Sequence, residues 1–513
     1  MRSPDRLPEP PPAALLFVVL AALGAGCPSG SEPPTRPPSD RTVTVTVATD
    51  TVVHRTDPRF LSFAVDSSQI AGTLFWNEDP ATSEEEPEVP VDPYDFTRAR
   101  LANLTAPLAP AFLRIGGTHA DHLLYDFSDD PETTAPEPYQ GVLTRAMWDP
   151  MADFARDLGL TIKFTVNAAE GPRDGDGVWL TDQAAELLTY IAEREDPVEV
   201  LELGNEPNGY PLLHGFSLDT EQYGDDLRAF AALRDQLLPD AKIAAPSVAY
   251  WPVSGEFITY LEPALEQGGD ALDVVTWHYY PQQSRRCPLQ TREAFPEVLQ
   301  DPAHLDEINT WAAEVEAAAG EHAPGAEIWL GETGNAQCGG ARGVSDRWAS
   351  SFWWLDQLGL LARRGQKVVV RQTLSGSDYG LMDDTTLTPR PDYWASLLWK
   401  TAMGTEVLDA TSADPTLRAW AHCAAGSGVA VLAINLSDEV TDLALPGLPE
   451  TGWRTWTLEA DTLESETVRL NGTTLQADGN GTPPALDPAE ADWLILPARS
   501  IGIAVTPAAG VCG

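Results

Sequence analysis

Short apolar runs alternate with stretches of helical periodicity along residues 58–400. Eight runs have the length of buried strands, and they are 60–66, 112–115, 160–167, 198–205, 242–246, 273–280, 327–332 and 367–373. The helical stretches between them include 147–158, 220–238 and 346–364. Strands that each precede a helix are typical of a parallel sheet covered by helices, and eight such units can close into a ring. The pattern therefore predicts an α/β fold, a (β/α)8 TIM barrel.

The pattern changes after about residue 400, where helical periodicity fades and strand-like runs appear at 429–436, 453–458 and 501–506. The dipeptide Asn471-Gly472, flanked by short strand-like segments, is a strong hairpin signal. We therefore expect a C-terminal β-sandwich domain at 401–513. A Thr/Val alternation begins at Thr42, ahead of the barrel, and we expect residues 42–57 to add one or more strands to that sandwich.

The first 27 residues have the features of an export signal. Two arginines precede an apolar run that is too short to span a membrane, and Gly24-Ala25-Gly26-Cys27 follows it. Small residues that end at a cysteine resemble a bacterial lipoprotein signal, in which Cys27 would carry the lipid. An ordinary cleaved signal or an uncleaved anchor are the alternatives. Residues 28–41 are rich in Pro and Ser and predict a disordered linker. We expect a protein that is exported and lipid-anchored to the bacterial cell envelope, or secreted.

The composition is strongly acidic, with 77 Asp and Glu against 32 Lys and Arg and a formal net charge of −45. Such a surface repels nucleic acid and anionic membranes, so we expect no nucleic-acid partner and membrane contact only through the N-terminal lipid. Neither a phosphate-binding glycine loop nor a Cys/His metal spacing occurs in the sequence. We expect no cofactor, no metal and a monomer. The 16 Trp indicate core packing or sugar-stacking platforms.

Two carboxylates fall at the ends of predicted barrel strands, where the active sites of such barrels lie. Glu206 ends the fourth run in the sequence LGNEP, and Glu332 ends the seventh run in the sequence WLGET. Retaining glycosidases place two carboxyl groups about 5–5.5 Å apart, one as acid/base and one as nucleophile. An isolated Asn-Glu-Pro is a weak signal that also occurs at helix starts. Its pairing with a strand-seven glutamate resembles the large glycosidase clan A, and this resemblance implies that Glu206 is the acid/base and Glu332 the nucleophile.

The two carboxyl groups need different protonation states. Glu206 must stay protonated near neutral pH, which requires burial or a nearby negative charge such as that of Glu332. Glu332 must stay ionised, and Arg114 at the end of the second run is a plausible cationic partner. Tyr280 at the end of the sixth run is a plausible hydrogen-bond donor to Glu332. A buried structural arginine and a core tyrosine are the alternative interpretations.

Several further motifs resemble the heparanase and β-glucuronidase family of retaining glycoside hydrolases, a member of the large glycosidase clan A. They include LRIGGT at 113–118, LGNEPN at 203–208, VTWHYY at 275–280 and WLGET at 329–333. The similarity runs from about Pro58 to the C-terminus. The resemblance implies a hydrolase that acts on oligo- or polysaccharides containing β-linked glucuronic acid, by a two-carboxylate double displacement.

The resemblance also implies roles for residues around the two glutamates. Asn205 would hydrogen-bond the sugar 2-hydroxyl, and Asp66 would bind hydroxyls of the terminal sugar. Tyr379, together with the backbone amides of Cys338 and Gly339, would hold the uronic acid carboxylate. The other implied positions are Thr118, Tyr280 and Gln372 for substrate binding, and Arg114 and His278 as supporting residues.

Four cysteines remain when Cys27 is set aside for lipid, and by number alone they allow three pairings. Cys338 stands where the family has a loop glycine. Cys287 and Cys338 follow strands six and seven, which are barrel neighbours, and we expect them to form a disulfide at the rim of the pocket. Cys423 and Cys512 match a bridge of the family's sandwich domain, so the resemblance implies a second disulfide.

This chain resembles animal heparanases, which carry Lys/Arg clusters beside the cleft, but the matching segments of this chain lack such clusters. Residues 139–143, 209–213 and 250–253 contain no Lys or Arg, and Arg285-Arg286 is a local positive pair that a solvated loop also explains. We therefore favour a β-glucuronide of low sulfation over heparan sulfate. An endo-acting heparanase and a catalytically silent carbohydrate-binding surface lipoprotein are the alternatives. The acidic insertion at 77–97 predicts a disordered surface loop or a segment near the pocket.

Overall fold

The structure is a computed structural model that describes residues 36–132 and 134–513. The predicted export signal at 1–27, the lipid site Cys27 and the first part of the linker at 28–41 lie outside the described residues. Residues 36–40 form no helix or strand, and the first strand begins at Arg41. Among the described helices, none combines the length and the apolar composition that a membrane span requires.

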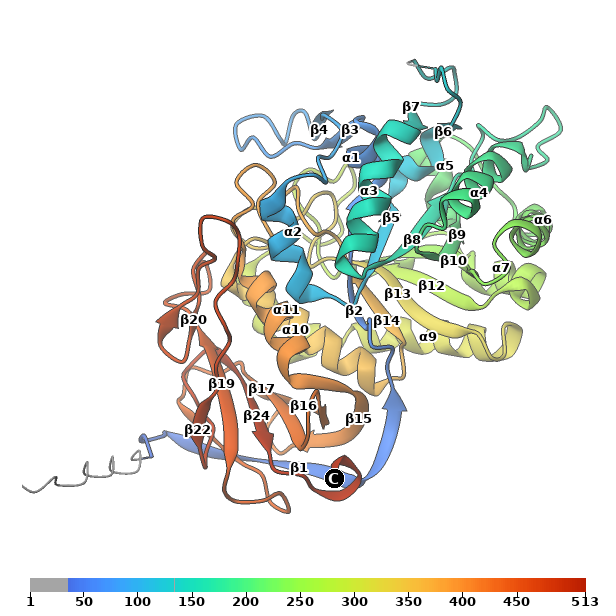
Figure 1. Cartoon of the computed structure of the whole chain (residues 1–513). Coiled ribbons are helices and arrows are strands. Elements are labelled where there is room, and N and C mark those ends of the chain that lie inside the picture. The colour runs from blue at the N-terminus through green and yellow to red at the C-terminus, as the bar shows by residue number, and fades with distance from the viewer. Residues whose placement is uncertain (1–35, 133) are drawn as a thin grey trace, which may run out of the picture. The chain divides into compact units, whose positions relative to one another are not determined.

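Eight parallel strands form a closed ring, which confirms the predicted TIM barrel (Figure 1). In order around the ring they are β2 (Leu61–Asp66), β5 (Phe112–Gly116), β8 (Thr161–Val166), β9 (Val198–Leu203), β10 (Lys242–Trp251), β12 (Val274–Tyr279), β13 (Glu327–Thr333) and β14 (Val368–Arg371). Neighbouring strands pair in parallel throughout, and β14 pairs with β2 to close the ring. Each predicted run coincides with one of these strands.

Helices follow most of the barrel strands, as the alternating pattern predicts. They are α1 (Ser67–Ala71), α2 (Ala99–Thr105), α3 (Arg145–Leu158), α4 (Asp182–Arg194), α5 (Tyr210–Leu213), α6 (Thr220–Leu237), α7 (Leu261–Gly268), α8 (Pro302–Leu305), α9 (Ile308–His322), α10 (Trp348–Arg363) and α11 (Pro391–Ala402). In α3, Trp148, Met151, Ala152 and Ala155 are buried, and their spacing forms one apolar stripe. In contrast, α10 is buried on every side from residue 348 to 362, because it packs against both the barrel and the C-terminal domain.

The C-terminal domain is rich in strands, as predicted, and it includes the early strand β1 (Arg41–Arg55). Its other strands are β15 (Met403–Ser412), β16 (Leu417–Ala424), β17 (Val429–Asn435), β18 (Thr441–Ala444), β19 (Trp453–Glu459), β20 (Arg469–Leu470), β21 (Thr473–Thr474), β22 (Ala489–Ala491), β23 (Ile495–Leu496) and β24 (Ser500–Thr506). β1 pairs antiparallel with β15 and parallel with β18. The β20–β21 hairpin turns at Asn471 and Gly472, whose φ values of 49° and 80° suit the tight turn that this dipeptide predicts.

Strand β17 shows how the C-terminal domain is packed on two faces. Ala430, Leu432 and Ile434 belong to the large apolar cluster that also contains the barrel helices. The alternate residues Val429 and Val431 belong to a second cluster with side chains of β1, β18 and β23. Side chains that alternate along a strand point to opposite faces, so β17 contributes to two cores. This arrangement fits the predicted β-sandwich.

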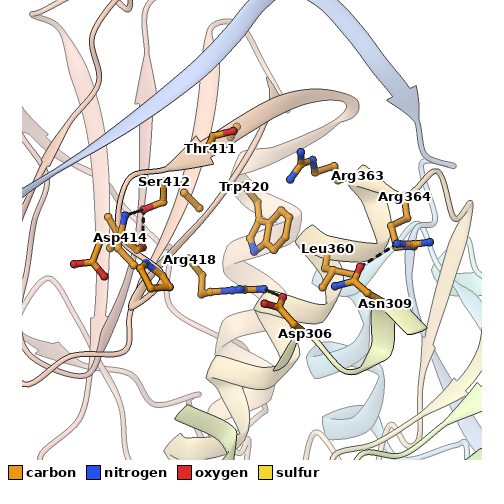
Figure 2. Close-up of a pocket in the computed structure, with 14 residues that line it drawn as sticks. Asp306, Asn309, Leu360, Arg363, Arg364, Thr411, Ser412, Asp414, Arg418 and Trp420 are labelled. Atoms are coloured by element: carbon orange, nitrogen blue, oxygen red, sulfur yellow. Dashed lines mark hydrogen bonds and ion pairs between the residues drawn. The ribbon is translucent and has the colours of Figure 1, made fainter. Parts of the chain in front are cut away.

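Polar side chains line a cavity of about 390 Å³ where the C-terminal domain contacts the barrel helices (Figure 2). Arg418 forms ion pairs with Asp306 and with the buried Asp356, and the Trp420 indole also donates to Asp356. Arg364 donates to Asn309 across the same cavity. None of the predicted site residues lines it. The cavity therefore belongs to the contact between the domains and not to the predicted active site.

Five further strands are short. Four of them form two pairs, which lie at the end of the barrel that carries the predicted site. The five strands are β3 (Leu74–Trp76), β4 (Glu88–Pro90), β6 (Leu123–Asp126), β7 (Gly141–Thr144) and β11 (Gly255–Glu256). β3 and β4 form an antiparallel hairpin in the connection after β2, and β6 and β7 form a parallel pair in the connection after β5.

The described part of the chain contains two disulfides, and both match the sequence predictions. Cys287 and Cys338 are joined across the connections that follow β12 and β13. Cys423 on β16 is joined to Cys512 near the C-terminus.

Candidate active site

The barrel strands carry the predicted site residues to one end of the barrel through their period of two. On β5, Phe112 lies in an apolar layer inside the barrel, and Arg114 stands two residues further along. On β9, Val200 lies in the same layer, and Glu202 follows it by two residues. Because side chains that are two residues apart point to the same face of a strand, a charged layer sits directly above the apolar one. The catalytic face lies above that charged layer.

Glu332, at the end of β13, is held by two of the partners that the sequence indicates. Arg114 Nη1 donates a hydrogen bond to Glu332 Oε2, and the Tyr280 hydroxyl donates to Glu332 Oε1 at 2.7 Å. Burial alone would raise the pKa of Glu332, but the charge of Arg114 acts together with other groups, among them the hydrogen-bond donors Tyr280 and Arg114, and this pKa lies below its ordinary value. Burial and the neighbouring Glu332 raise the pKa of Tyr280, so its hydroxyl remains a donor. An ionised, oriented carboxylate is what a nucleophile requires.

Glu206 faces Glu332 across the end of the barrel. Its backbone has a φ of 54°, a left-handed conformation that is unusual for a residue with a side chain and that recurs at functional sites. His278 Nδ1 lies 2.9 Å from Glu206 Oε1. One ligand-type atom from each of Glu206, His278 and Glu332 lies within 4.8 Å of the others. The two carboxylates are therefore as close as a retaining mechanism requires.

Below this pair lies a buried ionic cluster that the sequence analysis missed. Glu202 is fully buried and accepts hydrogen bonds from Lys163, from Arg114 at 3.2 Å and from Thr165 at 2.8 Å. Burial would raise the pKa of Glu202, but the charges of Lys163 and Arg114 hold this pKa well below its ordinary value. Burial lowers the pKa of Lys163 to about 8. The alternation of β9 was the available signal, since Glu202 follows the buried Val200 by two residues.

Asn205 is fixed from two sides. Its side-chain oxygen accepts a hydrogen bond from Arg114 Nη2 at 2.8 Å, and its backbone amide donates to Asp121 Oδ2 at 2.8 Å. The same Asp121 accepts from the Tyr210 hydroxyl and from the Ala168 amide, each at 2.8 Å. Burial raises the pKa of Asp121 to about 6. Arg114 therefore positions both Glu332 and Asn205, the residue predicted to bind the sugar 2-hydroxyl.

Asp66, Gln372 and Tyr379 lie together on the β2–β14 side of the site, as the resemblance implies. Gln372 Nε2 donates to Asp66 Oδ2 at 3.2 Å and to the Tyr379 hydroxyl at 3.4 Å. Burial raises the pKa of Asp66. A β-carbon at Gly117, whose φ is +98°, would lie 2.2 Å from Asp66 Oδ2, so only glycine fits there. Thr118 follows Gly117 along this wall.

The loop with Cys338 and Gly339 presents unpaired backbone amides. Cys338, Gly339 and Gly340 have φ values of 59°, 80° and 80° in succession. The Gly339 carbonyl accepts from the Tyr379 amide at 3.3 Å, which ties the loop to the predicted uronate pocket. Across residues 36–132 and 134–513, the amides of Cys338 and Gly339 donate to no acceptor. Free amides in such a turn are suited to an anion.

The interpretation of Arg285-Arg286 as a solvated positive pair is wrong for Arg286. This side chain is buried, forms an ion pair with Asp378 and donates to the Ser377 hydroxyl at 3.0 Å. Arg285 is exposed and forms an ion pair with Glu293. The pair is therefore neutralised by carboxylates, because the chain brings Asp378 to Arg286 from a connection more than ninety residues away.

The acidic segment at 77–97 is ordered by the β3–β4 hairpin and its partners, so its interpretation as a disordered loop is wrong. Phe75 is buried in one cluster with Tyr280 and Tyr379, and Trp76 packs against that cluster. Glu88 lies 3.8 Å from His119, and Glu84 lies 3.7 Å from Arg285. The hairpin thus forms a wall of the site that the sequence pattern did not locate.

Among residues 36–132 and 134–513, two groups of side chains have a geometry that suits a metal ion. One is Glu206, His278 and Glu332, and the other is the more exposed set Glu262, Glu321 and His322. In the first group Glu332 already accepts a hydrogen bond from Arg114, so a bound cation would lie against a guanidinium charge. This trio is better suited to proton transfer between carboxylates and substrate. The expectation of a metal-free enzyme stays a prediction.

Comparisons with known proteins identify the family of this chain. The family model described as "Glycosyl hydrolase family 79, N-terminal domain" matches residues 44–359. Heparanase from Gallus gallus is 32% identical over 477 residues, which cover 79% of this chain and 87% of that protein. Heparanase-like protein 1 from Arabidopsis thaliana is 32% identical over 363 residues, which cover 67% of this chain and 65% of the plant protein, less than two thirds of its length.

A solved structure with the same architecture is the GH51 α-L-arabinofuranosidase from Thermotoga petrophila. It has a TM-score of 0.65 and 14% sequence identity, and the match covers 90% of this chain and 99% of that one. At this identity the likeness shows a shared fold alone. The family match and the heparanase relatives confirm the resemblance that the sequence motifs indicate. This chain belongs to glycosyl hydrolase family 79, the heparanase-like glycoside hydrolases.

Proposed function

We propose that this protein is a retaining β-glucuronidase that removes glucuronic acid from the non-reducing end of its substrate. The observation that carries the proposal is the placement of the free Cys338–Gly339 amides and the Tyr379 hydroxyl next to an oriented carboxylate pair. Arg286 contacts this loop through the Cys338 carbonyl, but Asp378 neutralises its charge, so the amides and the phenol would bind the carboxylate without a free cation. Such a cation would compete with Arg114 for Glu332 and would perturb the protonation of both glutamates.

In the first half of the reaction, Glu332 attacks the anomeric carbon of the glucuronide. The bond to the leaving oxygen breaks as Glu206 transfers its proton to that oxygen, and an ester between Glu332 and the sugar forms. Arg114 and Tyr280 fix the two oxygens of Glu332 separately, so one hydrogen bond can remain on the carbonyl oxygen of the ester. The leaving alcohol departs on the side of Glu206.

In the second half, a water molecule replaces the leaving alcohol. Glu206, now ionised, takes a proton from the water as the water attacks the anomeric carbon, and the ester to Glu332 breaks. Two inversions at one carbon give net retention. His278, at 2.9 Å from Glu206, is placed to orient the acid/base in both halves.

The β3–β4 hairpin supports release of terminal sugars over internal cleavage. A β-carbon at Gly339 would lie 2.7 Å from Trp76 Cγ, so the indole covers the loop proposed to bind the carboxylate. In glucuronic acid the 4-hydroxyl is on the carbon next to the one that bears the carboxylate. The hairpin wall that covers the carboxylate therefore also borders the 4-hydroxyl. It obstructs a sugar chain that continues from the 4-oxygen.

The hairpin also disfavours sulfated extensions. Residues 77–97 contain eight acidic side chains and no Lys or Arg. Sulfate groups that approach this wall would meet like charge, and desolvation of unpaired charges is costly. This charge distribution favours substrates of low sulfation over heparan sulfate.

Removal of the Trp76 indole is expected to open the pocket. For Trp76→Ala we expect a roughly tenfold lower kcat/KM on a terminal aryl glucuronide, equal to about 1.4 kcal/mol, because the wall of the uronate site is lost. The same variant should gain cleavage of internal glucuronic acid bonds in unsulfated oligosaccharides, measured by product length. Leu74→Ala on the same strand, which is exposed and lies outside the aromatic cluster, is the control. Internal cleavage by the wild type would contradict an obstructed pocket.

The proposed substrate class is tested with 4-nitrophenyl β-D-glucuronide and the matched β-D-glucoside, which differ only at the carboxylate. The glucoside has no carboxylate, so the buried hydrogen-bond donors of the proposed uronate pocket would stay unpaired when it binds. We therefore expect the glucuronide to be preferred by about 10³-fold or more in kcat/KM. Equal turnover of both substrates would refute the uronate pocket. Absence of turnover on any uronide would favour the carbohydrate-binding alternative.

We also propose that the protein is exported. The disulfides Cys287–Cys338 and Cys423–Cys512 support this location, since such bonds persist in oxidising compartments. Mass spectrometry of the protein purified from its native envelope would find an acylated Cys27 at the N-terminus if the lipoprotein signal is used.

A further inference from the structure

Exposed apolar side chains gather on one side of the catalytic face. The structure exposes eleven large hydrophobic side chains within its described residues, and eight of them lie in the connections that follow β8, β9, β10 and β12. Each connection contributes two, among them Leu180, Leu213, Phe257 and Leu289. The connections after the other four barrel strands contribute Leu74 alone. These four strands are consecutive around the barrel, so the apolar residues occupy one half of its rim.

Contacts join these four connections, and Arg173 in the β8 connection donates to Asp226 in the β9 connection at 2.6 Å. The Glu206 amide donates to the Ser247 carbonyl at 3.2 Å, which joins the β9 connection to β10. The Thr291 hydroxyl donates to the Pro252 carbonyl at 2.9 Å, which joins the β12 and β10 connections. A β-carbon at Gly209 would lie 3.0 Å from Leu213 Cδ1 and 3.9 Å from Glu206 Cβ. The apolar half of the rim therefore begins beside the proposed acid/base.

The side of Glu206 is the side of the leaving group. The proposed uronate site lies toward β13, β14 and β2, where Tyr379, Gln372 and Asp66 meet. Glu206 must reach the oxygen of the leaving group in order to protonate it. The part of the substrate beyond that oxygen therefore extends over the connections after β9, β10 and β12.

This leaving-group surface offers flat apolar area and no available cation. Trp251 and Phe257 stack with ring centroids 5.2 Å apart and an interplanar angle of 22°, and Phe257 is 49% exposed. The seven arginines of the four connections each form an ion pair with a carboxylate, and the pairs are Arg173 with Asp226, Arg194 with Asp196, Arg228 with Asp225, Arg234 with Asp273, Arg285 with Glu293, Arg286 with Asp378 and Arg292 with Glu307. Apolar patches of this kind mark binding sites on soluble proteins.

We propose that this surface binds an apolar aglycone, so that the substrates are glucuronides of hydrophobic alcohols or phenols. The proposal rests on the β-glucuronidase function proposed above and specifies the leaving group. Apolar area removed from water drives such binding, and the stacked rings of Trp251 and Phe257 supply a platform for it. A sulfated sugar in this position would find paired arginines and apolar side chains instead of free cations.

The test uses methyl, butyl and hexyl β-D-glucuronides, whose leaving alcohols have similar acidity, at concentrations below micelle formation. Each buried methylene is expected to raise kcat/KM by about fourfold, so burial of the five extra methylenes of the hexyl compound should raise its kcat/KM about 10³-fold above that of the methyl compound. In the double variant Leu213→Ser/Phe257→Ser this ratio should fall by about tenfold. Val511→Ser, an exposed residue near the C-terminus, is the control and should keep the wild-type ratio. Melting temperatures establish that the variants are folded.

The outcomes separate the two proposals. Hydrolysis of all three compounds with no dependence on chain length would overturn the aglycone surface and leave the β-glucuronidase function intact. Inert compounds, together with an inert chromogenic glucuronide, would overturn both. A change of oligomeric state in the double variant at an unchanged hexyl-to-methyl ratio would assign the surface to a second copy of the chain.

Discussion

Replacement of Glu332 by Gln is expected to abolish turnover of every glucuronide, because it removes the carboxylate that Arg114 and Tyr280 orient as the nucleophile. Replacement of Glu206 by Gln should lower kcat/KM by about 10²–10⁴-fold for alkyl glucuronides, the usual contribution of a general acid. The loss should be smaller for leaving groups that depart without a proton, such as dinitrophenol. Initial rates across a series of leaving groups measure the difference.

Both variants should fold as the wild type does, so their loss of turnover would reflect a defect in the chemical step. In Glu332→Gln, Arg114 keeps Glu202 and Asn205 as partners. Glu327→Gln is the matched control, since Glu327 lies on the same strand β13 but pairs with Lys242 at the opposite end. It should keep wild-type activity. NMR of the first product should show the β-anomer, as the carboxylate spacing within 4.8 Å indicates. An α-anomer, or an active Glu332→Gln, would contradict the assignment.

The buried cluster beneath the site should make Glu202→Gln the most destabilising of these substitutions. Glu202 is the carboxylate shared by Lys163 and Arg114, and all three side chains are fully buried. Its loss leaves buried positive charge without a partner, which costs about 3–5 kcal/mol in the free energy of unfolding. Urea denaturation near pH 7 measures this difference. Activity should fall as well, because Arg114 would lose one of the anchors that direct it to Glu332 and Asn205.

A matched control lies on the same strand. Glu199 on β9 forms an ion pair with Arg59 at 2.6 Å, but its side chain is 54% exposed, so Glu199→Gln should cost less than about 1 kcal/mol. The effect of pH has a definite sign. The pKa of Glu202 is held well below its ordinary value, so its contribution is complete near neutral pH and is lost as pH falls through the folded-state pKa. The difference in the free energy of unfolding between wild type and Glu202→Gln should therefore become smaller at acid pH. A constant small gap would contradict the role of the cluster.

Much of the fold and the centre of the site could be predicted from the sequence, because they depend on local patterns. Each of the eight apolar runs corresponds to a barrel strand, since a buried parallel strand needs a short continuous apolar run. Glu206 and Glu332 follow such runs directly, and barrel chemistry is confined to that end of the strands. Arg114 and Tyr280 could be predicted as partners of Glu332 for the same reason.

Other features depend on contacts between distant segments, and the sequence pattern could not supply them. Arg286 was interpreted as part of a solvated pair, yet Asp378 neutralises it from a connection after β14. The acidic segment at 77–97 has the composition of a disordered loop, yet Phe75 and Trp76 anchor its hairpin to Tyr280 and Tyr379. Composition describes a segment in isolation. The ion pair of Arg286 and the ordered hairpin both depend on residues that are distant in the sequence.

By itself the sequence determined the barrel, the strand-rich C-terminal domain, the family and the positions of the two glutamates, because strand periodicity and motif spacing are local properties of the chain. Tertiary structure decided which charges are free and which surfaces surround the pair. The closed ring brings Glu202 between Lys163 and Arg114, and it places an acidic hairpin on one side of the site and apolar side chains on the other. Burial and pairing arise only when distant residues meet, and they hold the pKa of Glu332 below its ordinary value.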